Sequence, residues 1–330
     1  MKKLVKIPED AEIPLVGLIQ IGIIDRGTNL LQIRPTSICN LNCPFCSTDS
    51  GPFSKFHTTE YIAELDYLVE WVKELIKFKG KIHAFLDSVG ETLTYKKIVE
   101  LVQEISEMDV ESIAIETNGT LLTEKLVDEL KEAGLHRINL SLHALNEELA
   151  KKLAGDKSYD VKKILEIARY IAESGIELLI TPVWIPGIND EEIPKIIEFT
   201  KSINKNKRWP FLGIQKYEIH KYGRKIERVK ALNWWKFFRK IEEWEKEFKV
   251  KLRIRPEDFG IKKVKIYPIV FEKGEKARVK ILAPGWMKNE MIGVARNRSL
   301  TILNCEAEIG DEIKVRILRN KHNLYIAEKI

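Results

Sequence analysis

The sequence Cys39-Asn-Leu-Asn-Cys43-Pro-Phe-Cys46 places three cysteines within eight residues, with the spacing C-x3-C-x2-C. Three thiolates on one short loop can bind three irons of a four-iron cluster and leave the fourth iron without a cysteine ligand. Such an iron is open to a ligand from outside the protein. We therefore expect residues elsewhere in the chain that hold this ligand.

The cysteine spacing argues against two other uses of the loop. A structural zinc site needs four ligands, but the nearest histidine, His57, lies 11 residues after Cys46 and no second cysteine pair exists. A disulfide would leave one of the three cysteines unpaired, and the only other cysteine is Cys305. The loop is therefore interpreted as an iron–sulfur loop.

Length and composition are typical of a globular protein in a reducing compartment. The 330 residues suffice for one large domain and a small one, and the hydrophobic fraction of 44% supports a sizeable core. No apolar run reaches membrane-spanning length, and Pro8-Glu9-Asp10 interrupts the N-terminus too early for a signal peptide. Few cysteines and an expected cluster indicate the cytoplasm. The charged fraction of 32% and the scarcity of glutamine are typical of thermophilic proteins.

The positive charge is concentrated at the C-terminal end of the sequence. Residues 259–330 hold 15 lysines and arginines against 8 acidic residues, whereas the remainder is nearly neutral. A local basic excess is typical of nucleic-acid binding, although a solvated basic surface has the same composition.

Hydrophobic periodicity predicts alternating strands and helices over most of the chain. The expected strands are Leu30–Pro35, Ile82–Leu86, Ser112–Glu116, Arg137–Leu142, Glu177–Trp184 and Phe211–Ile219. The expected helices are Thr59–Lys79, Tyr95–Met108, Thr123–Ala133, Asp160–Ser174, Asp190–Ser202 and Ala231–Phe248. Six strand–helix units indicate a parallel sheet covered by helices, and they are fewer than the eight of a closed barrel. The α/β fold is therefore expected to be a partial (βα)6 barrel.

Two further segments lie outside this repeat. Leu15–Ile24 and Leu30–Ile33 flank the turn Asp25-Arg-Gly-Thr-Asn29, which predicts a hairpin ahead of the first repeat. Closely spaced short strands follow from about residue 264 and predict a small β-barrel. These strands are expected at Val264–Phe271, Lys276–Ile281, Met291–Arg296, Ser299–Cys305, Glu312–Arg319 and Asn323–Lys329. The predicted domains are residues 1–29 as an N-terminal hairpin extension, 30–258 as the partial barrel and 259–330 as the β-barrel.

Polar residues follow each strand of the repeat, where parallel α/β barrels collect their chemistry. The cysteine loop follows the first strand, Ser88-Val-Gly90-Glu91-Thr92 the second and Thr117-Asn118-Gly119 the third. Ser141-Leu-His143 ends the fourth strand, and the last two strands end near Pro186–Asp190 and Gln215–His220. Each of these residues, taken alone, is best explained as part of a turn or as a helix cap. Because all of them lie at or after the carboxyl ends of the six strands, we expect them to form one site.

With these residues the chain resembles the radical S-adenosylmethionine (radical SAM) superfamily over residues 30–220. The cysteine loop, with Phe45 just before Cys46, is similar to the signature of that superfamily. The resemblance implies that Cys39, Cys43 and Cys46 bind a [4Fe-4S] cluster and that SAM chelates the free iron. It also implies reductive cleavage of SAM to a 5′-deoxyadenosyl radical, with the electron coming from an external donor.

The resemblance implies SAM contacts at the later strand ends. Gly90-Glu91 is similar to the Gly-Gly-Glu-Pro motif that contacts the methionine amine, although Val89 and Thr92 replace its outer residues. A carboxylate such as Glu91 can accept charge-assisted hydrogen bonds from an ammonium group. The remaining matches are Thr117, Asn118, Ser141, Val183 and Gln215. The catalytic residues that act on the substrate stay unassigned.

The C-terminal strands resemble a TRAM domain, an RNA-binding appendage often found on tRNA-modifying enzymes. The segments that carry this likeness are Lys273–Lys280, Arg296–Thr301 and Ile309–Arg316. The likeness coincides with the basic excess, so phosphate contacts are expected there. The candidates are Arg278, Lys280, Lys288, Arg296, Arg298, Lys314 and Arg316. Trp286 and Tyr325 could stack on bases or belong to the core.

The cysteine count narrows the chemistry that this resemblance allows. Radical SAM methylthiotransferases, dual-cysteine RNA methylases and wyosine-type synthases need further cysteines, and only Cys305 remains. The leading hypothesis is a single-cluster radical SAM enzyme that modifies RNA, with tRNA as the first candidate. The alternatives are an enzyme acting on a small molecule or peptide, with a purely structural barrel, and a non-catalytic iron–sulfur RNA-binding protein. The modified position and the oligomeric state do not follow from the sequence.

Overall fold

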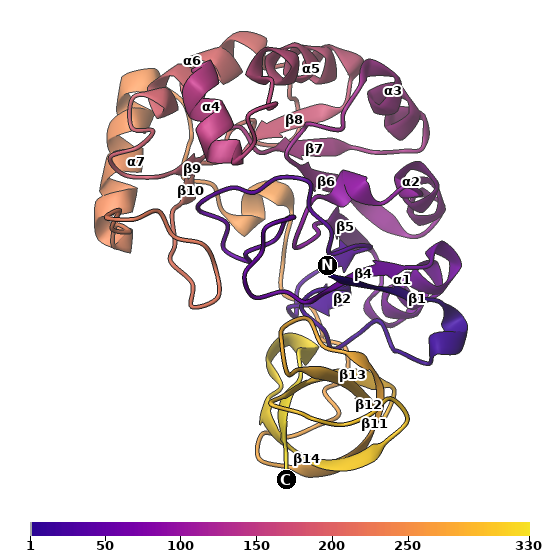
Figure 1. The fold of residues 1–330 in the computed structure, drawn as a ribbon. Helices are drawn as coiled ribbons and strands as arrows, with labels where there is room; N and C mark the ends of the chain where they lie inside the picture. The colour runs from indigo at the N-terminus through magenta and orange to yellow at the C-terminus, as the bar shows by residue number, and fades with distance from the viewer. Residues whose placement is uncertain (1) are drawn as a thin grey trace. The chain divides into compact units, whose positions relative to one another are not determined.

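The computed structural model describes residues 2–330, in which a strand–helix alternation is followed by a series of strands without α-helices (Figure 1). The strands up to the last helix are β1 (Lys3–Ile7), β2 (Gly22–Asp25), β3 (Leu30–Arg34), β4 (Thr59–Ala63), β5 (Ile82–Leu86), β6 (Val110–Thr117), β7 (Arg137–Leu140), β8 (Glu177–Ile180), β9 (Val183–Trp184) and β10 (Gln215–Lys216). The later strands are β11 (Lys276–Pro284), β12 (Met291–Ala295), β13 (Arg298–Leu303), β14 (Glu312–Arg319) and β15 (Ile326–Lys329). The α-helices are α1 (Leu65–Lys79), α2 (Ile98–Ser106), α3 (Glu124–Glu132), α4 (Glu147–Ala154), α5 (Val161–Ser174), α6 (Glu192–Ile203) and α7 (Trp234–Phe248).

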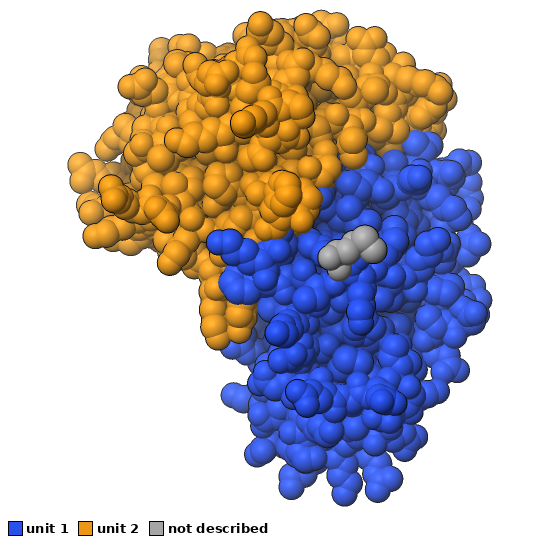
Figure 2. All heavy atoms as spheres, viewed as in Figure 1, with its two compact units in different colours: residues 1–39, 54–113, 262–330 blue, residues 40–53, 114–261 orange. Residues whose placement is uncertain are grey.

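The residues pack into two compact units, coloured separately in Figure 2. Unit 1 consists of residues 1–39, 54–113 and 262–330, and unit 2 of residues 40–53 and 114–261. Both units are built from segments that are distant in the sequence. Because the units are defined by packing in three dimensions, they do not test the predicted domain boundaries. The division into residues 1–29, 30–258 and 259–330 remains a prediction.

The main sheet has the strand order β2-β3-β5-β6-β7-β8 within the described part of the chain. In unit 1, β3 pairs in parallel with β5. In unit 2, the end of β6 pairs in parallel with β7, and β7 pairs in parallel with β8. Parallel strands joined by helices form the repeat that the periodicity predicted. The carboxyl ends of β6, β7 and β8 therefore share one edge in unit 2.

The predicted hairpin is present in unit 1, where β2 pairs antiparallel with β3. Asp25, at its turn, accepts a 2.8 Å bond from the Lys79 ammonium group, and both side chains are fully buried. Its other carboxylate oxygen accepts the Tyr267 backbone N–H at 2.7 Å. The Lys79 ammonium group also donates to the Lys265 carbonyl. A buried ion pair with these extra bonds ties α1 and the segment before the barrel to the hairpin.

The C-terminal strands close into a barrel with the order β11-β12-β13-β15-β14. Alternate side chains point inward and form a separate hydrophobic core. This core contains Phe271, Val279, Ile281, Leu300, Ile302, Cys305, Val315, Ile317, Tyr325 and Ala327. Tyr325 and Trp286 are both buried, so both belong to the interior and do not offer stacking surfaces.

Two segments of unit 1 differ from the sequence-based expectation. The predicted helix Thr59–Lys79 begins at Leu65, because Thr59–Ala63 forms β4 and pairs in parallel with β1. The predicted strand Val264–Phe271 is absent among the described residues, since its N–H groups bond to the hairpin at Asp25 and Gly27. In both cases a partner distant in the chain satisfies the backbone and decides the conformation.

Unit 2 departs from the expected pattern at two elements. The sixth strand, expected over Phe211–Ile219, is reduced to β10, which pairs with β9. Because Pro182 has no N–H to donate, the strand on the other side of this pair is interrupted between β8 and β9. Helix α4 was not predicted, although Asn146 caps it through the Leu149 N–H and Gly155 ends it in the left-handed conformation. In the part of the chain that the structure describes, no helix is both long and apolar enough to span a membrane.

Candidate functional site

The cysteine loop is tightly wound in unit 2. The Cys46 N–H donates to the Cys43 carbonyl at 3.2 Å, and the Asp49 N–H donates to the Cys46 carbonyl at 3.4 Å. The Cys46 sulfur lies 3.3 Å from the Thr48 hydroxyl. The Cys43 and Cys46 side chains are partly exposed, and Cys39, in unit 1, is partly exposed as well. The thiols are therefore accessible to a ligand.

Arg224, which follows β10 in the second sequence segment of unit 2, binds this loop. Its guanidinium donates to Asp49 Oδ1 at 2.7 Å, to Asn42 Oδ1 at 2.7 Å and to the Cys43 carbonyl at 2.9 Å. It also donates to the Ser50 carbonyl. The planar guanidinium can serve several acceptors at once, which the single ammonium of lysine cannot do with the same geometry. Arg224 therefore holds the backbone on both sides of Cys43 and Cys46.

The backbone of Arg224 adds to this clamp. Its N–H donates to the Cys46 carbonyl at 2.8 Å. A Cβ on the preceding residue, Gly223, would lie 2.6 Å from the Ser47 carbonyl oxygen and 2.9 Å from that of Cys46. Only glycine allows so close an approach of the two chains. Arg224 does not stand out in the sequence, because a single arginine in a loop carries no motif.

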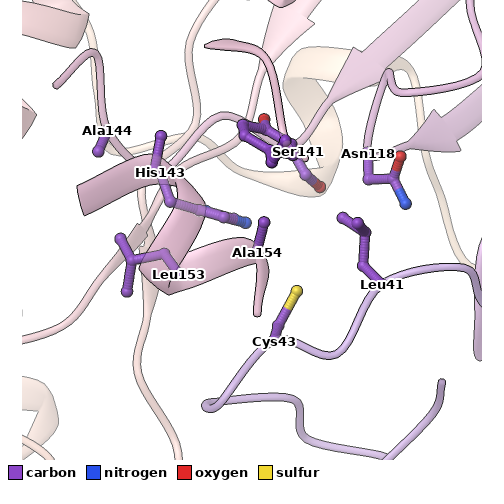
Figure 3. Close-up of a pocket in the computed structure, with 10 residues that line it drawn as sticks. Leu41, Cys43, Asn118, Ser141, His143, Ala144, Leu153 and Ala154 are labelled. Atoms are coloured by element: carbon purple, nitrogen blue, oxygen red, sulfur yellow. The ribbon is translucent and has the colours of Figure 1, made fainter. Parts of the chain in front are cut away.

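A small pocket in unit 2 brings together three of the predicted site residues. Cys43, Asn118 and Ser141 all line it, together with His143 (Figure 3). The Asn118 side chain donates to Asn40 Oδ1 at 3.0 Å, and Asn40 in turn donates to the Thr120 hydroxyl at 2.8 Å. The end of β6 is thereby bonded to the residue that follows Cys39.

The polar residues beneath this pocket are bonded to one another. The Ser141 hydroxyl donates to Glu116 Oε1 at 3.1 Å, and the Thr181 hydroxyl donates to the same oxygen at 3.1 Å. Thr117 is buried, and its hydroxyl accepts the Gly119 N–H at 3.0 Å. Thr117 thus shapes the turn after β6, whereas Asn118 and Ser141 reach the pocket.

Val183 and Gln215, two of the predicted SAM contacts, are directly opposite each other in the β9–β10 pair. The Gln215 side chain is exposed and that of Val183 is partly exposed. The Gln215 N–H donates to the Pro182 carbonyl at 2.8 Å. The structure therefore places these two residues together, on a short ladder outside the main sheet.

His143 packs edge-on against Phe45, with ring centroids 4.9 Å apart. Its Nδ1 accepts the Val183 N–H at 3.1 Å, so a neutral ring carries its proton on Nε2. Removal from water lowers the pKa of His143 to about 4. The ring is therefore neutral at physiological pH and helps to seat the aromatic residue of the cysteine loop.

This pKa predicts a pH dependence of stability. The unfolded histidine gains its proton near its usual pKa of 6.5, whereas the folded one gains it near 4. The unfolded state thus binds more protons between these values, and the stabilisation present above pH 6.5 is lost as the pH falls towards 4. Chemical denaturation of the wild type and of His143→Gln should show a stability difference that shrinks over this range. A difference independent of pH would contradict the prediction.

In unit 1, Gly90 and Glu91 lie against the segment that leads to Cys39. A Cβ on Gly90 would lie 2.3 Å from the Ile38 carbonyl oxygen, and the Glu91 N–H donates to that oxygen at 2.8 Å. The Glu91 carboxylate is buried and accepts the Leu93 N–H at 3.0 Å. Thr92, at the position of the motif's proline, accepts the Ser88 N–H and so closes the turn by a hydrogen bond.

The donor set fits a cluster better than a single metal ion. Among residues 2–330, no three or more His, Cys, Asp or Glu side chains are grouped closely enough to hold one metal ion. The thiolates of a four-iron cluster each bind a different iron, so they need not converge on one point. Partly exposed thiols on a loop clamped by Arg224 suit such a cluster.

The predicted RNA contacts belong to the barrel of unit 1 and differ in exposure. Arg278 and Lys314 are exposed and directly opposite each other on β11 and β14, and Lys288 is exposed in a turn. Lys280 lies opposite Glu312 in the strand register and forms a 3.5 Å ion pair with Glu12, and Arg316 forms a 3.1 Å ion pair with Glu328. Arg278, Lys314 and Lys288 are therefore the best exposed of the set.

Two arginines of the set are engaged within the barrel. Arg298 is only 3% exposed, and its guanidinium donates to the Asn297 and Pro268 carbonyls and lies over the Tyr267 ring. The expectation that Arg298 contacts phosphate is therefore wrong, because its donors are directed into the protein. Arg296 is exposed but forms an ion pair with Glu275.

Comparison with protein families agrees with this geometry. A family model described as the radical SAM superfamily matches residues 33–200. A protein of Methanocaldococcus jannaschii with no characterised function is 43% identical over 342 residues, which cover 96% of this chain and 79% of that protein. The GTP 3′,8-cyclase of Aquifex aeolicus is 32% identical over 181 residues, 54% of this chain and 55% of the cyclase. The match thus spans about half the length of that relative.

Solved structures share the fold at low identity. Streptococcus suis SuiB bound to its precursor peptide SuiA has a TM-score of 0.51 at 18% identity, over 68% of this chain and 47% of SuiB. A radical SAM methyltransferase from Sphaerobacter thermophilus also has a TM-score of 0.51, at 16% identity, over 68% of this chain and 65% of that enzyme. These likenesses and the closed C-terminal barrel confirm the predicted fold class, an α/β fold with a small β-barrel.

Proposed function

We propose that this chain, which belongs to the radical SAM superfamily, modifies RNA, with tRNA as the first candidate, through a single [4Fe-4S] cluster. Enzymes of this superfamily use that cluster together with SAM and receive their electron from an external donor. When bound, cluster and SAM supply the radical that removes a hydrogen atom from the substrate. The protein contributes binding, orientation and exclusion of water.

The proposed ligands of the cluster are Cys39, Cys43 and Cys46. Asn118 and Ser141 are proposed to contact SAM beside Cys43, because all three residues line one pocket. The buried Glu91 carboxylate is proposed to accept the ammonium group of SAM. Thr117 and Gly90 contribute through the backbone turns that they shape.

The observation that carries the RNA proposal is a pair of like-charge contacts on the barrel. Antiparallel register places Lys276 opposite Arg316 and Arg278 opposite Lys314. All four residues are exposed and lie on one face, since they alternate with inward residues. Like charges directly opposite each other destabilise a sheet. Glu328 pairs with Arg316 at 3.1 Å, so the repulsion concerns mainly Arg278 and Lys314. A bound polyanion would relieve this repulsion, and a TRAM-like role of the barrel would explain it.

RNA binding tests this face directly. Replacing Arg278 and Lys314 by alanine should weaken binding of total tRNA and lower the slope of log affinity against log salt by about 1 to 2. The stability of the variant should not fall, because a repulsive pair is removed. Lys125→Ala, which removes an equally exposed charge from α3, is the control and should leave the slope unchanged. An unchanged slope in the double variant would count against RNA on the barrel.

The activity itself is tested by nucleoside mass spectrometry. A strain that lacks this chain should lose one modified nucleoside from its tRNA, and the gene with intact cysteines should restore it. An unchanged modification profile would overturn the RNA proposal.

A second candidate substrate is a nucleotide-sized small molecule. The likeness to GTP 3′,8-cyclases over about half of the chain favours it, since those relatives act on a free purine nucleotide. In that case the tRNA profile would stay unchanged, while incubation with SAM, a reductant and candidate nucleotides would consume one of them.

A further inference from the structure

A second basic segment lies in unit 2, outside the barrel. Residues 216–240 hold nine lysines and arginines against two acidic residues, Glu218 and Glu227. The same 25 residues contain six aromatic side chains, which are Tyr217, Tyr222, Trp234, Trp235, Phe237 and Phe238. Basic and aromatic residues interleaved in this way are typical of surfaces that bind single-stranded nucleic acid.

Two tryptophans of this segment are exposed on the first turn of α7. Trp234 is 53% and Trp235 is 65% exposed. Phe237, Ile241 and Trp244 of the same helix are buried and anchor it in the core. The core side of α7 is thus already occupied, and burial in this unit does not account for the two neighbouring indole rings. Adjacent exposed aromatic side chains mark interaction surfaces more often than single ones do.

The two rings are held in place by their neighbours. Trp234 stacks on Phe238, with centroids 5.5 Å apart and an interplanar angle of 23°. The Lys216 ammonium group lies 4.7 Å from the centroid of Trp234, and the Arg239 guanidinium lies 5.4 Å from that of Trp235. Both cations lie over the ring faces. Lys216 is only 8% exposed and also pairs with Glu218 at 3.2 Å, so it fixes the position of Trp234, whereas Lys236 and Arg239 are exposed and available to phosphate.

The same segment reaches the cysteine loop. Arg224 lies ten residues before Trp234 and donates to Asp49 and to the backbone of the loop. An RNA strand bound to the two tryptophans would thereby be held on the same unit as Cys43 and Cys46. This link connects the surface to the proposed chemistry.

We propose that Trp234 and Trp235 form a stacking platform for unpaired bases of the RNA substrate, with the exposed Lys236 and Arg239 as its phosphate contacts. This inference rests on the proposed function and adds a second RNA surface to it. Unpaired bases fit because stacking on an indole needs a free base face, which a paired duplex does not offer. An acidic protein could form ion pairs with the cations, but its carboxylates would not stack on the indole rings.

The test measures binding of a labelled, unstructured oligoribonucleotide to the full-length protein by fluorescence anisotropy. Trp234→Leu with Trp235→Leu keeps apolar bulk but removes both stacking rings, and binding should weaken about 5- to 150-fold for each base that loses its partner. Trp234→Phe with Trp235→Phe is the matched control, because it keeps an aromatic face and should retain most of the affinity. Lys236→Ala should lower the salt slope by about 1.

The outcomes separate this inference from the proposed function. Equal affinities of the wild type and the leucine variant would overturn the platform, whereas loss of a tRNA nucleoside in the deletion strain would still support RNA modification. Equal weakening by the leucine and phenylalanine variants would also overturn it, because stacking would not be the cause. Unchanged RNA binding combined with loss of an acidic protein partner would assign the surface to a protein interface instead.

Discussion

Cys43→Ala is expected to remove nearly all cluster-bound iron and to abolish formation of 5′-deoxyadenosine from SAM. The same result is expected for Cys39→Ala and Cys46→Ala, because each thiolate binds one iron of the proposed cluster and no neighbouring cysteine can replace it. Iron and sulfide analysis of anaerobically reconstituted protein measures the first effect. Chromatography of the products after addition of SAM and dithionite measures the second.

Cys305→Ala is the matched control for these variants. Cys305 is buried in the core of the barrel, and burial raises the pKa of its thiol. A protonated, inaccessible thiol is a poor iron ligand. The variant should therefore keep the wild-type iron content, with a small loss of stability from the cavity. Loss of cluster iron in Cys305→Ala would contradict a three-cysteine site.

Arg224→Ala is expected to make the cluster labile while leaving all three cysteines in the chain. The variant loses the guanidinium that bonds to Asp49, Asn42 and the Cys43 carbonyl. Asp49 is fully buried, and removal of the partner of a buried charge costs about 3–5 kcal/mol. The local cost should appear as loosening of the cysteine loop. We expect faster loss of iron to a chelator and a broadened electron paramagnetic resonance signal of the reduced cluster.

Two further variants show whether the effect comes from the guanidinium geometry. Arg224→Lys keeps the charge but cannot serve the same set of acceptors, so it should restore the signal only in part. Lys225→Ala removes the adjacent exposed cation and should behave as the wild type. If Arg224→Ala kept both the signal and the resistance to chelator, Arg224 would not position the cluster.

Net charge summed over long stretches of sequence points to only one of the two basic surfaces. Residues 259–330 stood out because their net charge is positive over a long stretch, whereas residues 216–240 belong to a remainder whose charges nearly cancel in the sum. The helix predicted over Ala231–Phe248 is present as α7, but its periodicity did not show which of its aromatic residues are buried. Phe237 and Trp244 are buried, but Trp234 and Trp235 are exposed, which periodicity alone does not distinguish.

The sequence by itself determined the features that depend on local spacing. The cysteine loop, the strand–helix repeat, the β2–β3 hairpin and most helix ends follow from neighbouring residues, because a turn, a cap or a periodic face is decided within a few positions. The presence of Asn118 and Ser141 beside Cys43 also followed, since parallel strands end at one edge of the sheet.

Only the tertiary structure decided the features that depend on a distant partner. Arg224 binds an aspartate 175 residues away, Thr59–Ala63 becomes a strand because β1 pairs with it, and Arg298 is turned into the barrel by the carbonyls that it meets there. Each of these residues is compatible with several conformations on its own. The hydrogen bonds and burial that select one of them arise only when segments far apart in the chain pack together.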